Sequence, residues 1–193
     1  MDQLLHIHTN GIQQDGKDTF HNHRYEPTPY EWLEKLFDNF FLSSVDTLVD
    51  FGCGKGRLNF YVSYRFSCHT KGIEFNPNYY EDALVNLSSY VRRKQSDIHF
   101  FLCKAQDYQV QPEDTVFYFF NPFSPPIFKK VIANVQKSLE KIPRKAYCIL
   151  YYPDEEYIDF LTNQTGFQLI KSIAVNPDSQ NPRDCFLIYA TTH

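Results

Sequence analysis

A cluster of glycines behind a short apolar run constrains this sequence more than any other feature. Among 193 residues the chain has seven glycines, near half of the average usage of about 7%, and three of them, Gly52, Gly54 and Gly56, fall within five residues. Residues 47–51 predict a buried strand that runs into the cluster, and a helix is expected after it. Glycine accepts positive φ and lets a ligand approach the backbone without a Cβ in the way. The segment therefore predicts a strand–loop–helix turn whose loop binds a ligand.

Predicted strands and helices alternate along the rest of the chain. Apolar residues at helical spacing predict helices at about 27–41, 57–66, 77–94, 126–141 and 154–165. The helix at 77–94 is expected to place on one side Tyr80, Ala83, Leu84, Leu87 and Val91. Short apolar runs predict further strands at about 69–75, 98–103, 115–120, 145–152, 167–175 and 184–191. The last two are joined by a turn-rich loop, so the sequence predicts an α/β fold: a seven-stranded, mostly parallel sheet with helices on both faces and a C-terminal antiparallel hairpin.

The length of the chain fits one domain of about 100–200 residues. Residues 1–25 are polar, hold four of the seven histidines and show no sustained periodicity, so they predict an N-terminal arm or lid before a domain at 26–193. His21 and His23, with His6 and His8 nearby, match no helical or finger spacing of metal ligands. No metal site is therefore expected.

Charge and cysteine usage restrict the partners and the compartment. The net charge of −4 lacks the cationic excess that binding to a phosphate backbone requires, which disfavours nucleic acid as a partner. No run approaches the roughly 20 apolar residues of a membrane span, and the N-terminus does not resemble a secretory signal. Five scattered cysteines without a Cys-x-x-Cys pair are typical of reduced thiols. We expect a soluble, cytoplasmic protein that acts on a small molecule or a protein, and the sequence leaves its oligomeric state open.

Two acidic residues near the glycine loop indicate the kind of ligand. Parallel sheets bind ligands at the carboxyl ends of their strands. Glu74 ends the second predicted strand, twenty residues after Gly54, where a carboxylate accepts hydrogen bonds from both hydroxyls of a ribose. The glycine spacing is Gly-x-Gly-x-Gly rather than the dinucleotide pattern Gly-x-Gly-x-x-Gly, and Asp50 stands two positions before the first glycine. A buried acid there repels a pyrophosphate and suits a ligand with an ammonium group, such as S-adenosyl-L-methionine.

Residues 49–57 (VDFGCGKGR) resemble motif I of the class I S-adenosylmethionine-dependent methyltransferases, and Glu74 matches the ribose-binding acid of that family. The resemblance spans about residues 26–193 and implies a Rossmann-like fold with the strand order 3-2-1-4-5-7-6. The cofactor-binding residues that it implies are Asp50, Gly52, Cys53, Gly54, Gly56, Arg57, Glu74 and Phe75. Residues 25–30 (YEPTPY) resemble the segment before the first helix in a subset that includes protein lysine methyltransferases, which implies that Tyr25 and Thr28 close over the cofactor.

The sequence departs from this family after the third predicted strand, where many members carry an acid that holds the adenine amino group. The matching position is Lys104. Ala105 and Gln106 are expected to supply backbone and amide contacts instead, with Asp107 as a further substitute. Which group replaces the acid stays open.

The segment Asn121-Pro122-Phe123, after the fourth predicted strand, resembles the Asn/Asp-Pro-Pro-Tyr/Phe motif of methyltransferases that act on amino or amide nitrogens, without its second proline. In that motif the Asn oxygen accepts hydrogen bonds from the NH₂ group of the acceptor, and the aromatic ring stacks on it. The resemblance makes these three residues the catalytic candidates, with Asn121 also beside the cofactor. The other interpretation is a proline-rich loop before a helix. Electron-rich rings of Phe123, Tyr152 and Tyr30 are expected at the mouth of the site, and no residue stands out as a general base.

The sequence therefore predicts a methyltransferase that uses S-adenosylmethionine and acts on an amino or amide nitrogen of a protein or small molecule. Two alternatives stay open. A module that binds the cofactor but has lost catalysis is compatible with the partial match at residues 121–123. A nicotinamide-dependent oxidoreductase is disfavoured by the glycine spacing and by the terminal hairpin.

Overall fold

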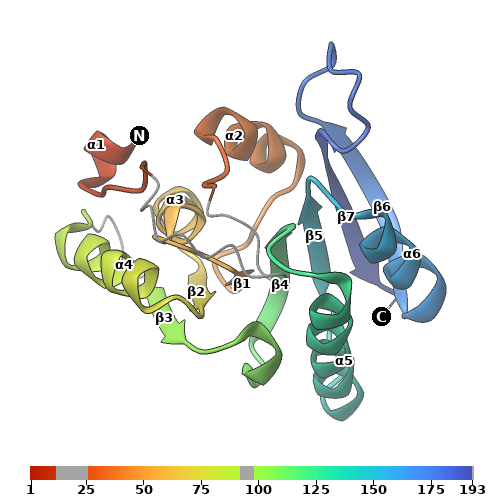
Figure 1. Ribbon diagram of the computed structural model, residues 1–193. Helices are drawn as coiled ribbons and strands as arrows, with labels where there is room; N and C mark the ends of the chain where they lie inside the picture. The colour runs from red at the N-terminus through yellow and green to blue at the C-terminus, as the bar shows by residue number, and fades with distance from the viewer. Residues whose placement is uncertain (12–25, 92–97, 193) are drawn as a thin grey trace.

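Seven strands form one sheet in the part of the chain that the structure, a computed structural model, describes: residues 1–11, 26–91 and 98–192 (Figure 1). The strands are β1 (Thr47–Phe51), β2 (His69–Glu74), β3 (Ile98–Leu102), β4 (Asp114–Phe120), β5 (Tyr147–Tyr151), β6 (Phe167–Ala174) and β7 (Cys185–Thr191). Their order is β3-β2-β1-β4-β5-β7-β6. Strands β1 to β5 pair in parallel, and β7 pairs antiparallel with both β5 and β6. The predicted fold class and the strand order implied by the resemblance are confirmed.

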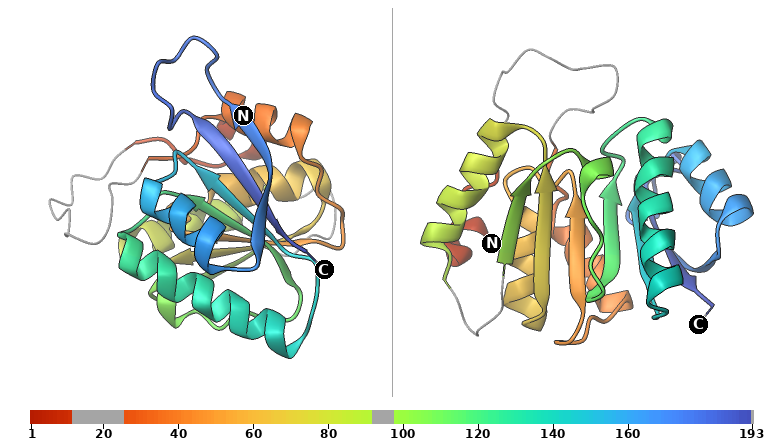
Figure 2. Two further views of the ribbon diagram at one scale, coloured as in Figure 1. Left: turned by 90° about the vertical axis from the view of Figure 1, so that its right-hand side faces the viewer. Right: turned by 90° about the horizontal axis from the view of Figure 1, so that it is seen from below.

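Two layers of helices cover the sheet (Figure 2). The helices α2 (Tyr30–Asn39), α3 (Arg57–Phe66) and α4 (Pro77–Ser89) cover one face, and α5 (Pro125–Lys141) and α6 (Glu155–Gln164) cover the other. Successive residues of β1 serve both layers, since Leu48 packs with α2 and α3 whereas Val49 packs with α5 and α6. Burial on both faces explains why the central strands are nearly continuous apolar runs rather than alternating ones.

Local signals in the sequence set the starts of three helices. The side chain of Asn76 caps α4 by accepting a hydrogen bond from the amide of Asn78 at 2.9 Å, and a proline follows at the first helical position. Asp154 caps α6 by accepting one from the amide of Glu156 at 2.8 Å. Two prolines open α5. These caps satisfy amide groups that have no partner inside the helix.

Residues 1–11, hereafter the N-terminal segment, belong to the expected arm or lid and pack against α3 and α4. The segment contains a four-residue helix, α1 (Asp2–Leu5), and Leu5 and Ile7 are 0% and 1% exposed. Both side chains join a cluster formed by α3, α4 and β3. The rest of the expected arm, 12–25, lies outside the described residues, so the domain boundary at residue 26 stays a prediction.

The connection between β3 and β4 contains the short 3-10 helix η1 (Ala105–Asp107) where a parallel sheet commonly has a full crossover helix. None of the helices in the described ranges is both long and apolar enough to cross a membrane.

Candidate functional site

The predicted site residues follow strands whose carboxyl ends meet at one edge of the sheet. The glycine loop follows β1, Glu74 ends β2, Asn121 follows β4 and Tyr152 follows β5. Asn121 and Tyr152 have positive φ angles of 38° and 49°. Such angles are uncommon for residues other than glycine and cluster at functional sites. Two of the four residues other than glycine that have positive φ in the described ranges therefore lie at this edge; the other two are His6 and Ser67.

The glycines bring the loop into direct contact with its neighbours. Gly52 has a φ of 80°, and a Cβ added to it would lie 2.7 Å from the Cβ of Pro122. Gly56 has a φ of 84°, and a Cβ there would lie 2.6 Å from the ring of Phe100. The absent Cβ of Gly52 lets the glycine loop lie on Pro122, so the predicted cofactor motif and the predicted acceptor motif are adjacent.

Glu74 holds the glycine loop from the side of β2. One carboxylate oxygen accepts a hydrogen bond from the amide of Gly54 at 2.9 Å, and the other accepts from the amides of Phe75 at 2.9 Å and Asn76 at 2.8 Å. Burial raises the pKa of Glu74, and the three amide donors oppose that rise. Because a carboxylate offers about four acceptor positions, three amides leave one for a ligand hydroxyl.

Asp50 is a buried carboxyl that makes no hydrogen bond to any described residue. It is 5% exposed and pairs with Tyr118 across the β1–β4 register. Burial, and to a smaller extent the charge of Glu74, raise the pKa of Asp50 to about 8. No cation among the described residues contributes to that pKa. A ligand with a positive group would therefore stabilise the ionised form of Asp50.

Asn121 has an unused acceptor atom. Its Oδ1 is buried and finds no hydrogen-bond partner among the described residues. Buried polar atoms are rarely left unpaired, so such an atom at the end of a central strand is a candidate contact for a ligand. Pro122 lies against Gly52, and Phe123 is 4% exposed, with its ring centroid 6.2 Å from that of Phe119. The ring of Phe123 thus packs in the core rather than at the open edge.

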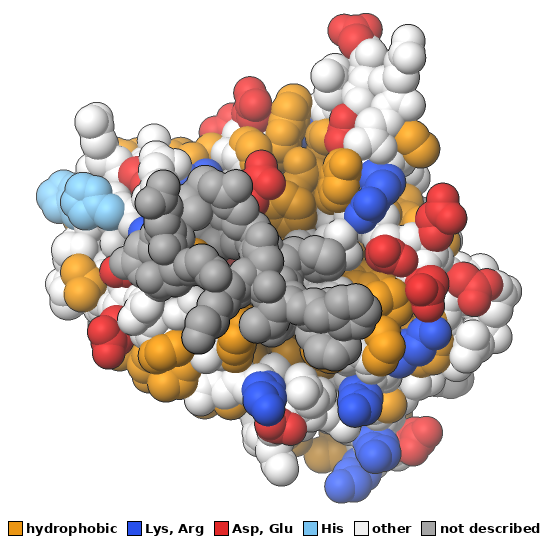
Figure 3. Space-filling model, in the orientation of Figure 1, with side chains coloured by type: hydrophobic (Ala, Val, Ile, Leu, Met, Phe, Trp, Pro, Cys, Tyr) orange, Lys and Arg blue, Asp and Glu red, His pale blue; other side chains and the backbone are white. Residues whose placement is uncertain are grey.

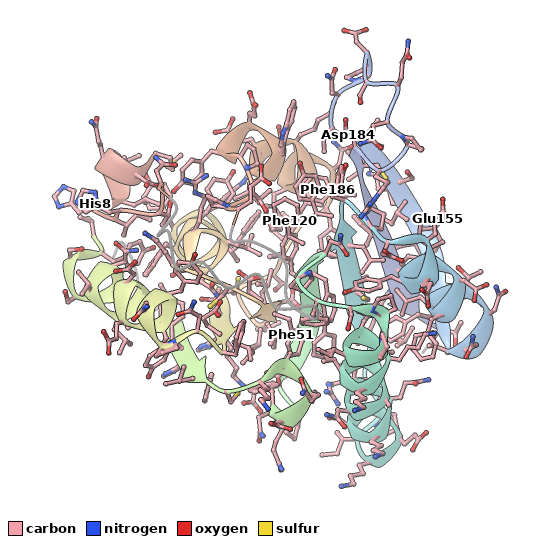
Figure 4. The ribbon with its side chains drawn as sticks, in the orientation of Figure 1. His8, Phe51, Phe120, Glu155, Asp184 and Phe186 are labelled. Atoms are coloured by element: carbon pink, nitrogen blue, oxygen red, sulfur yellow. The ribbon has the colours of Figure 1, made fainter. Side chains whose placement is uncertain are left out.

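Other aromatic rings, which the motif did not indicate, lie next to Asn121. The centroid of the Phe120 ring is 4.4 Å from that of Tyr151, and the Tyr151 ring is 4.6 Å from that of Phe186 (Figure 4). Phe120 is only partly buried. Figure 3 shows hydrophobic side chains at the surface between α2 and the loop that joins β6 to β7. The run of aromatic residues at the end of β4 could have indicated an aromatic surface here. The sequence pattern of that run does not show which of its rings is exposed to solvent.

Tyr152 connects this aromatic surface to the β6–β7 loop. The guanidinium of Arg183 lies 4.4 Å from the centre of the Tyr152 ring, and its Nε donates to the carbonyl of Pro153 at 2.9 Å. The hydroxyl of Tyr152 accepts a hydrogen bond from the side chain of Asn181 at 2.9 Å. These contacts hold Tyr152 in its left-handed conformation. They also attach the hairpin loop beside the residue that follows β5.

The residues expected near an adenine lie along the other side of Glu74. Phe75 is 46% exposed, and the turn after β3 begins next to Glu74, because the amide of Cys103 donates to the Glu74 carbonyl at 3.0 Å. Ala105 and Gln106 are half-buried in η1, and the carbonyl of Gln106 accepts a hydrogen bond from Asn134 at 2.8 Å. The backbone carbonyl of Gln106 is therefore already engaged within the protein. Lys104 is exposed.

Arg57 and Thr28 contact each other. Nη1 of Arg57 donates to the carbonyl of Thr28 at 3.3 Å, and its Nε donates to the hydroxyl of Thr9 at 2.7 Å. Thr28 is 5% exposed, and its hydroxyl lies 2.8 Å from that of Tyr118, the neighbour of Asp50. The guanidinium of Arg57 thus bonds to the protein itself. Tyr25 lies outside the described residues.

The described residues at this edge do not include a reactive cysteine or a group of metal-ligating side chains. Cys53 is 6% exposed, and burial raises the pKa of its thiol well above the usual range, which disfavours the reactive thiolate. Within residues 1–11, 26–91 and 98–192, no three His, Cys, Asp or Glu side chains gather to hold a metal ion. His21 and His23 lie outside these ranges.

No protein-family model and no curated protein sequence matches this chain. Solved structures do resemble it. An RNA methyltransferase from Salinibacter ruber in complex with S-adenosyl-L-homocysteine has a TM-score of 0.61 at 16% identity, over 86% of this chain and 92% of that one. A SAM-dependent methyltransferase from Methanosarcina mazei has a TM-score of 0.62 at 14% identity, over 81% and 96%. TYW2 from M. jannaschii in complex with AdoMet has a TM-score of 0.58 at 14% identity, over 86% and 77%. The fold is that of class I methyltransferases.

Proposed function

We propose that this protein is a methyltransferase that binds S-adenosylmethionine and methylates an amino or amide nitrogen. The observation that carries the proposal is the Asp50 carboxyl, buried without a hydrogen-bond partner in the described structure and next to a glycine loop that Glu74 holds in place. A cofactor with both an ammonium group and ribose hydroxyls matches these two acids. Supporting this, solved structures with the same fold are methyltransferases, and two of them contain S-adenosylhomocysteine or AdoMet.

The residues present fit such a cofactor by chemistry and by space. Asp50 would hold the ammonium group, and the remaining acceptor position of Glu74 would hold a ribose hydroxyl. The backbone at Gly54, which has no Cβ and a positive φ, would let the ligand lie against the loop. The exposed ring of Phe75 is available to an adenine.

When bound, S-adenosylmethionine supplies an electrophilic methyl group on a sulfonium. The residues of this chain would bind and orient the acceptor, since a methyl transfer depends chiefly on positioning. The free Oδ1 of Asn121 would accept a hydrogen bond from an N–H of the acceptor and so hold its nitrogen. The partly buried ring of Phe120, beside Asn121, would take the stacking role that the sequence assigned to Phe123.

Methylation assays with a panel of acceptors would identify the substrate. The net charge of −4 disfavours nucleic acid as a partner, but the comparisons do not support that prediction, because a neighbour with this fold is an RNA methyltransferase. A panel of acceptors should therefore include proteins, small amines and amides, and RNA.

Isothermal titration with S-adenosylhomocysteine tests the proposal, with Asp50→Ala as the variant and Glu81→Gln, on the exposed side of α4, as the control. We expect the wild-type protein and the control to bind and the Asp50 variant to lose at least tenfold in affinity. Absence of binding to the wild type would overturn the proposal, and binding of reduced nicotinamide, followed by its fluorescence, would favour the oxidoreductase alternative. Cofactor binding without methyl transfer to any acceptor of the panel would favour a module that has lost catalysis.

A further inference from the structure

We propose that the N-terminal segment is part of the cofactor site defined under the proposed function, with Arg57 as the positioning residue that connects the two. The inference rests on that proposed function. It concerns residues that would touch neither cofactor nor acceptor. Their contacts form two separate routes, one from the segment to the surroundings of Asp50 and one from the segment to the glycine loop.

The N-terminal segment has a fixed conformation of its own. The carboxylate of Asp2 accepts hydrogen bonds from the amide of Thr9 at 2.8 Å and from its hydroxyl at 2.9 Å, which closes the segment into a loop. The hydroxyl of Tyr30 also donates to Asp2. Leu5 and Ile7 anchor this loop in the apolar cluster with α3 and α4. Because the segment has a fixed conformation and position, its contacts can fix the positions of the residues that it touches.

The first route runs through Arg57, the first residue of α3 and therefore next to the glycine loop. Its guanidinium is buried and donates to Thr9, to the side chain of Asn10 and to the carbonyl of Thr28. It also lies 4.6 Å from the centre of the Tyr30 ring. A guanidinium presents its N–H groups in a fixed planar fork, so one side chain sets the relative positions of the N-terminal segment and of residues 28–30.

The first route ends at the buried carboxyl of the site. The hydroxyl of Thr28 lies 2.8 Å from the hydroxyl of Tyr118, and Tyr118 pairs with Asp50 in the sheet. A displacement of Thr28 would thus change the surroundings of the group that we propose to hold the ammonium.

The second route reaches the glycine loop through α4. The side chain of Asn86, 2% exposed, accepts a hydrogen bond from the amide of His8 at 2.7 Å. The same side chain donates to the carbonyl of Lys55, inside the glycine loop, at 3.0 Å. The two routes together indicate that the segment holds both the surroundings of Asp50 and the glycine loop in their binding conformation. Breaking the contact between Arg57 and the segment should weaken cofactor binding and leave the chemistry unchanged.

Thr9→Val tests this inference, because valine keeps the size of threonine but loses the hydroxyl that Arg57 and Asp2 contact. Thr9→Ser restores the hydroxyl. Ser89→Ala is the matched control, since the Ser89 hydroxyl donates to the carbonyl of His6 at 2.6 Å and so docks the same segment without touching Arg57. Any affinity tag belongs at the C-terminus, away from the docked segment. The readouts are the Kd for S-adenosylhomocysteine, the KM of the cofactor against kcat, and hydrogen exchange of the amides at 28–33 in the free protein.

We expect Thr9→Val to raise the Kd and the cofactor KM about tenfold with kcat unchanged, which is the size of losing one hydrogen bond to a charged group. Exchange at 28–33 should become faster, and Thr9→Ser and Ser89→Ala should match the wild type. Equal Kd values for Thr9→Val and the wild type would overturn the inference, as would an equal loss in Ser89→Ala, which would indicate general loosening. If the wild type binds no S-adenosylhomocysteine, the proposed function fails. In that case unchanged exchange at 28–33 in Thr9→Val would separately refute the link.

Discussion

Several unfavourable features of single residues lie at the carboxyl edge of the sheet, although Asn59 in α3 also has a buried side chain without a partner in the described part of the chain and His6 and Ser67 also have positive φ. The Asp50 carboxyl and the Asn121 Oδ1 are buried without hydrogen-bond partners among the described residues, and Asn121 and Tyr152 have positive φ. Features of this kind cost on the order of 1–3 kcal/mol each and persist where the surrounding structure fixes them. A ligand that supplies the missing partners would remove part of that cost. Asp50 and Asn121, which weaken the free protein in this way, are thus residues that we propose bind the ligand.

Replacing Asp50 by asparagine should stabilise the free protein, and the gain should increase with pH. The folded pKa of Asp50 is about 8, above its ordinary value of 3.8. Between these two values the folded state binds more protons than the unfolded state, so the wild-type free energy of unfolding falls as pH rises, by up to about 1.4 kcal/mol per pH unit. Asparagine does not ionise. The stability difference should be near zero at about pH 4 and largest at about pH 8.

Urea unfolding of the free protein at several pH values between 4.5 and 8.5, a range chosen to span that transition, measures this effect. The same Asp50→Asn variant should bind S-adenosylhomocysteine at least tenfold more weakly, because the ammonium loses its charged partner. Glu81→Gln serves as the exposed control and should follow the wild-type pH profile. A stability difference that is constant with pH would show that Asp50 does not titrate as described.

Asn121→Ala should lower kcat at least tenfold while changing the Kd for S-adenosylhomocysteine less than twofold. The reason is that its Oδ1 is unused in the free protein and is proposed to hold the acceptor. Asn121→Asp keeps an acceptor oxygen in that position and should retain more activity than the alanine variant. Methyl transfer at saturating cofactor is the measurement. An equal loss of cofactor affinity and of turnover in Asn121→Ala would place the residue in the cofactor site instead.

At the scale of elements, the sequence allowed most of the fold to be predicted because the strands and helices carry strong local signals. The strand at 47–51 and the helix at 57–66 have the predicted bounds, and the other elements differ at their ends by a few residues. The docking of the N-terminal segment could not be predicted, because Leu5 and Ile7 form no periodic pattern and their partners lie far away in the sequence. The short helix η1 likewise has no apolar period to reveal it.

Helix α4 shows why the apolar pattern was only partly right. Leu84 and Val91, expected on its apolar side, are each 40% exposed, whereas Asn86 is 2% exposed. Asn86 is buried because its amide group bonds to the backbone of His8 and of Lys55. A polar residue that is buried for its hydrogen bonds cannot be distinguished from a surface residue in a single sequence.

The sequence indicated which motifs lie at the candidate site, but not which aromatic side chains are accessible there. The glycine loop, Glu74 and Asn121 lie at one edge, as the strand order requires. Which aromatic ring is accessible depends on the turn after β4, where the positive φ of Asn121 redirects the chain. After that turn the Phe123 ring packs in the core, whereas Phe120, the last residue of β4, is partly accessible.

The contact between the glycine loop and the turn after β4 makes Gly52 a sensitive position. Gly52→Ala adds a Cβ 2.7 Å from Pro122 in a residue whose φ is +80°. Gly11 has a φ of +87° with nothing within 4 Å of an added Cβ, and Gly166 has neither constraint. We therefore expect Gly166→Ala to be neutral or slightly stabilising, Gly11→Ala to cost about 1 kcal/mol, and Gly52→Ala to cost more than either and to weaken cofactor binding.

Chemical denaturation of the three alanine variants, followed by titration with S-adenosylhomocysteine, gives both quantities. Equal losses of stability in the Gly11 and Gly52 variants would mean that backbone strain alone acts. In that case the contact with Pro122 would not constrain the glycine loop.

For the whole molecule, the apolar layers and the functional edge have different energetic roles. Side chains on both faces of the central strands are fully buried, which makes the sheet the stable part of the fold. At the carboxyl edge of this sheet, Asp50 is buried without a cation beside it among the described residues, which destabilises the free protein. Because Asp50 lies in the central strand β1, a ligand that pairs with Asp50 should stabilise the sheet and the helices that pack on it.

S-adenosylhomocysteine should therefore raise the unfolding temperature of the whole domain, and at a fixed ligand concentration the rise should be larger at pH 8 than at pH 6. Below its pKa of about 8, Asp50 in the free protein is mostly protonated, and that proton must leave before the carboxylate can pair with the ammonium. The affinity should thus increase with pH by up to about tenfold per unit and level off near pH 8. A hundredfold excess of ligand over its Kd corresponds to about 2.7 kcal/mol of stabilisation. Calorimetric titration in two buffers of different ionisation enthalpy measures the protons released on binding. At pH 6.5 we expect the wild type to release close to one proton and Asp50→Asn to release none. A thermal shift that does not depend on pH, without proton release, would contradict this linkage.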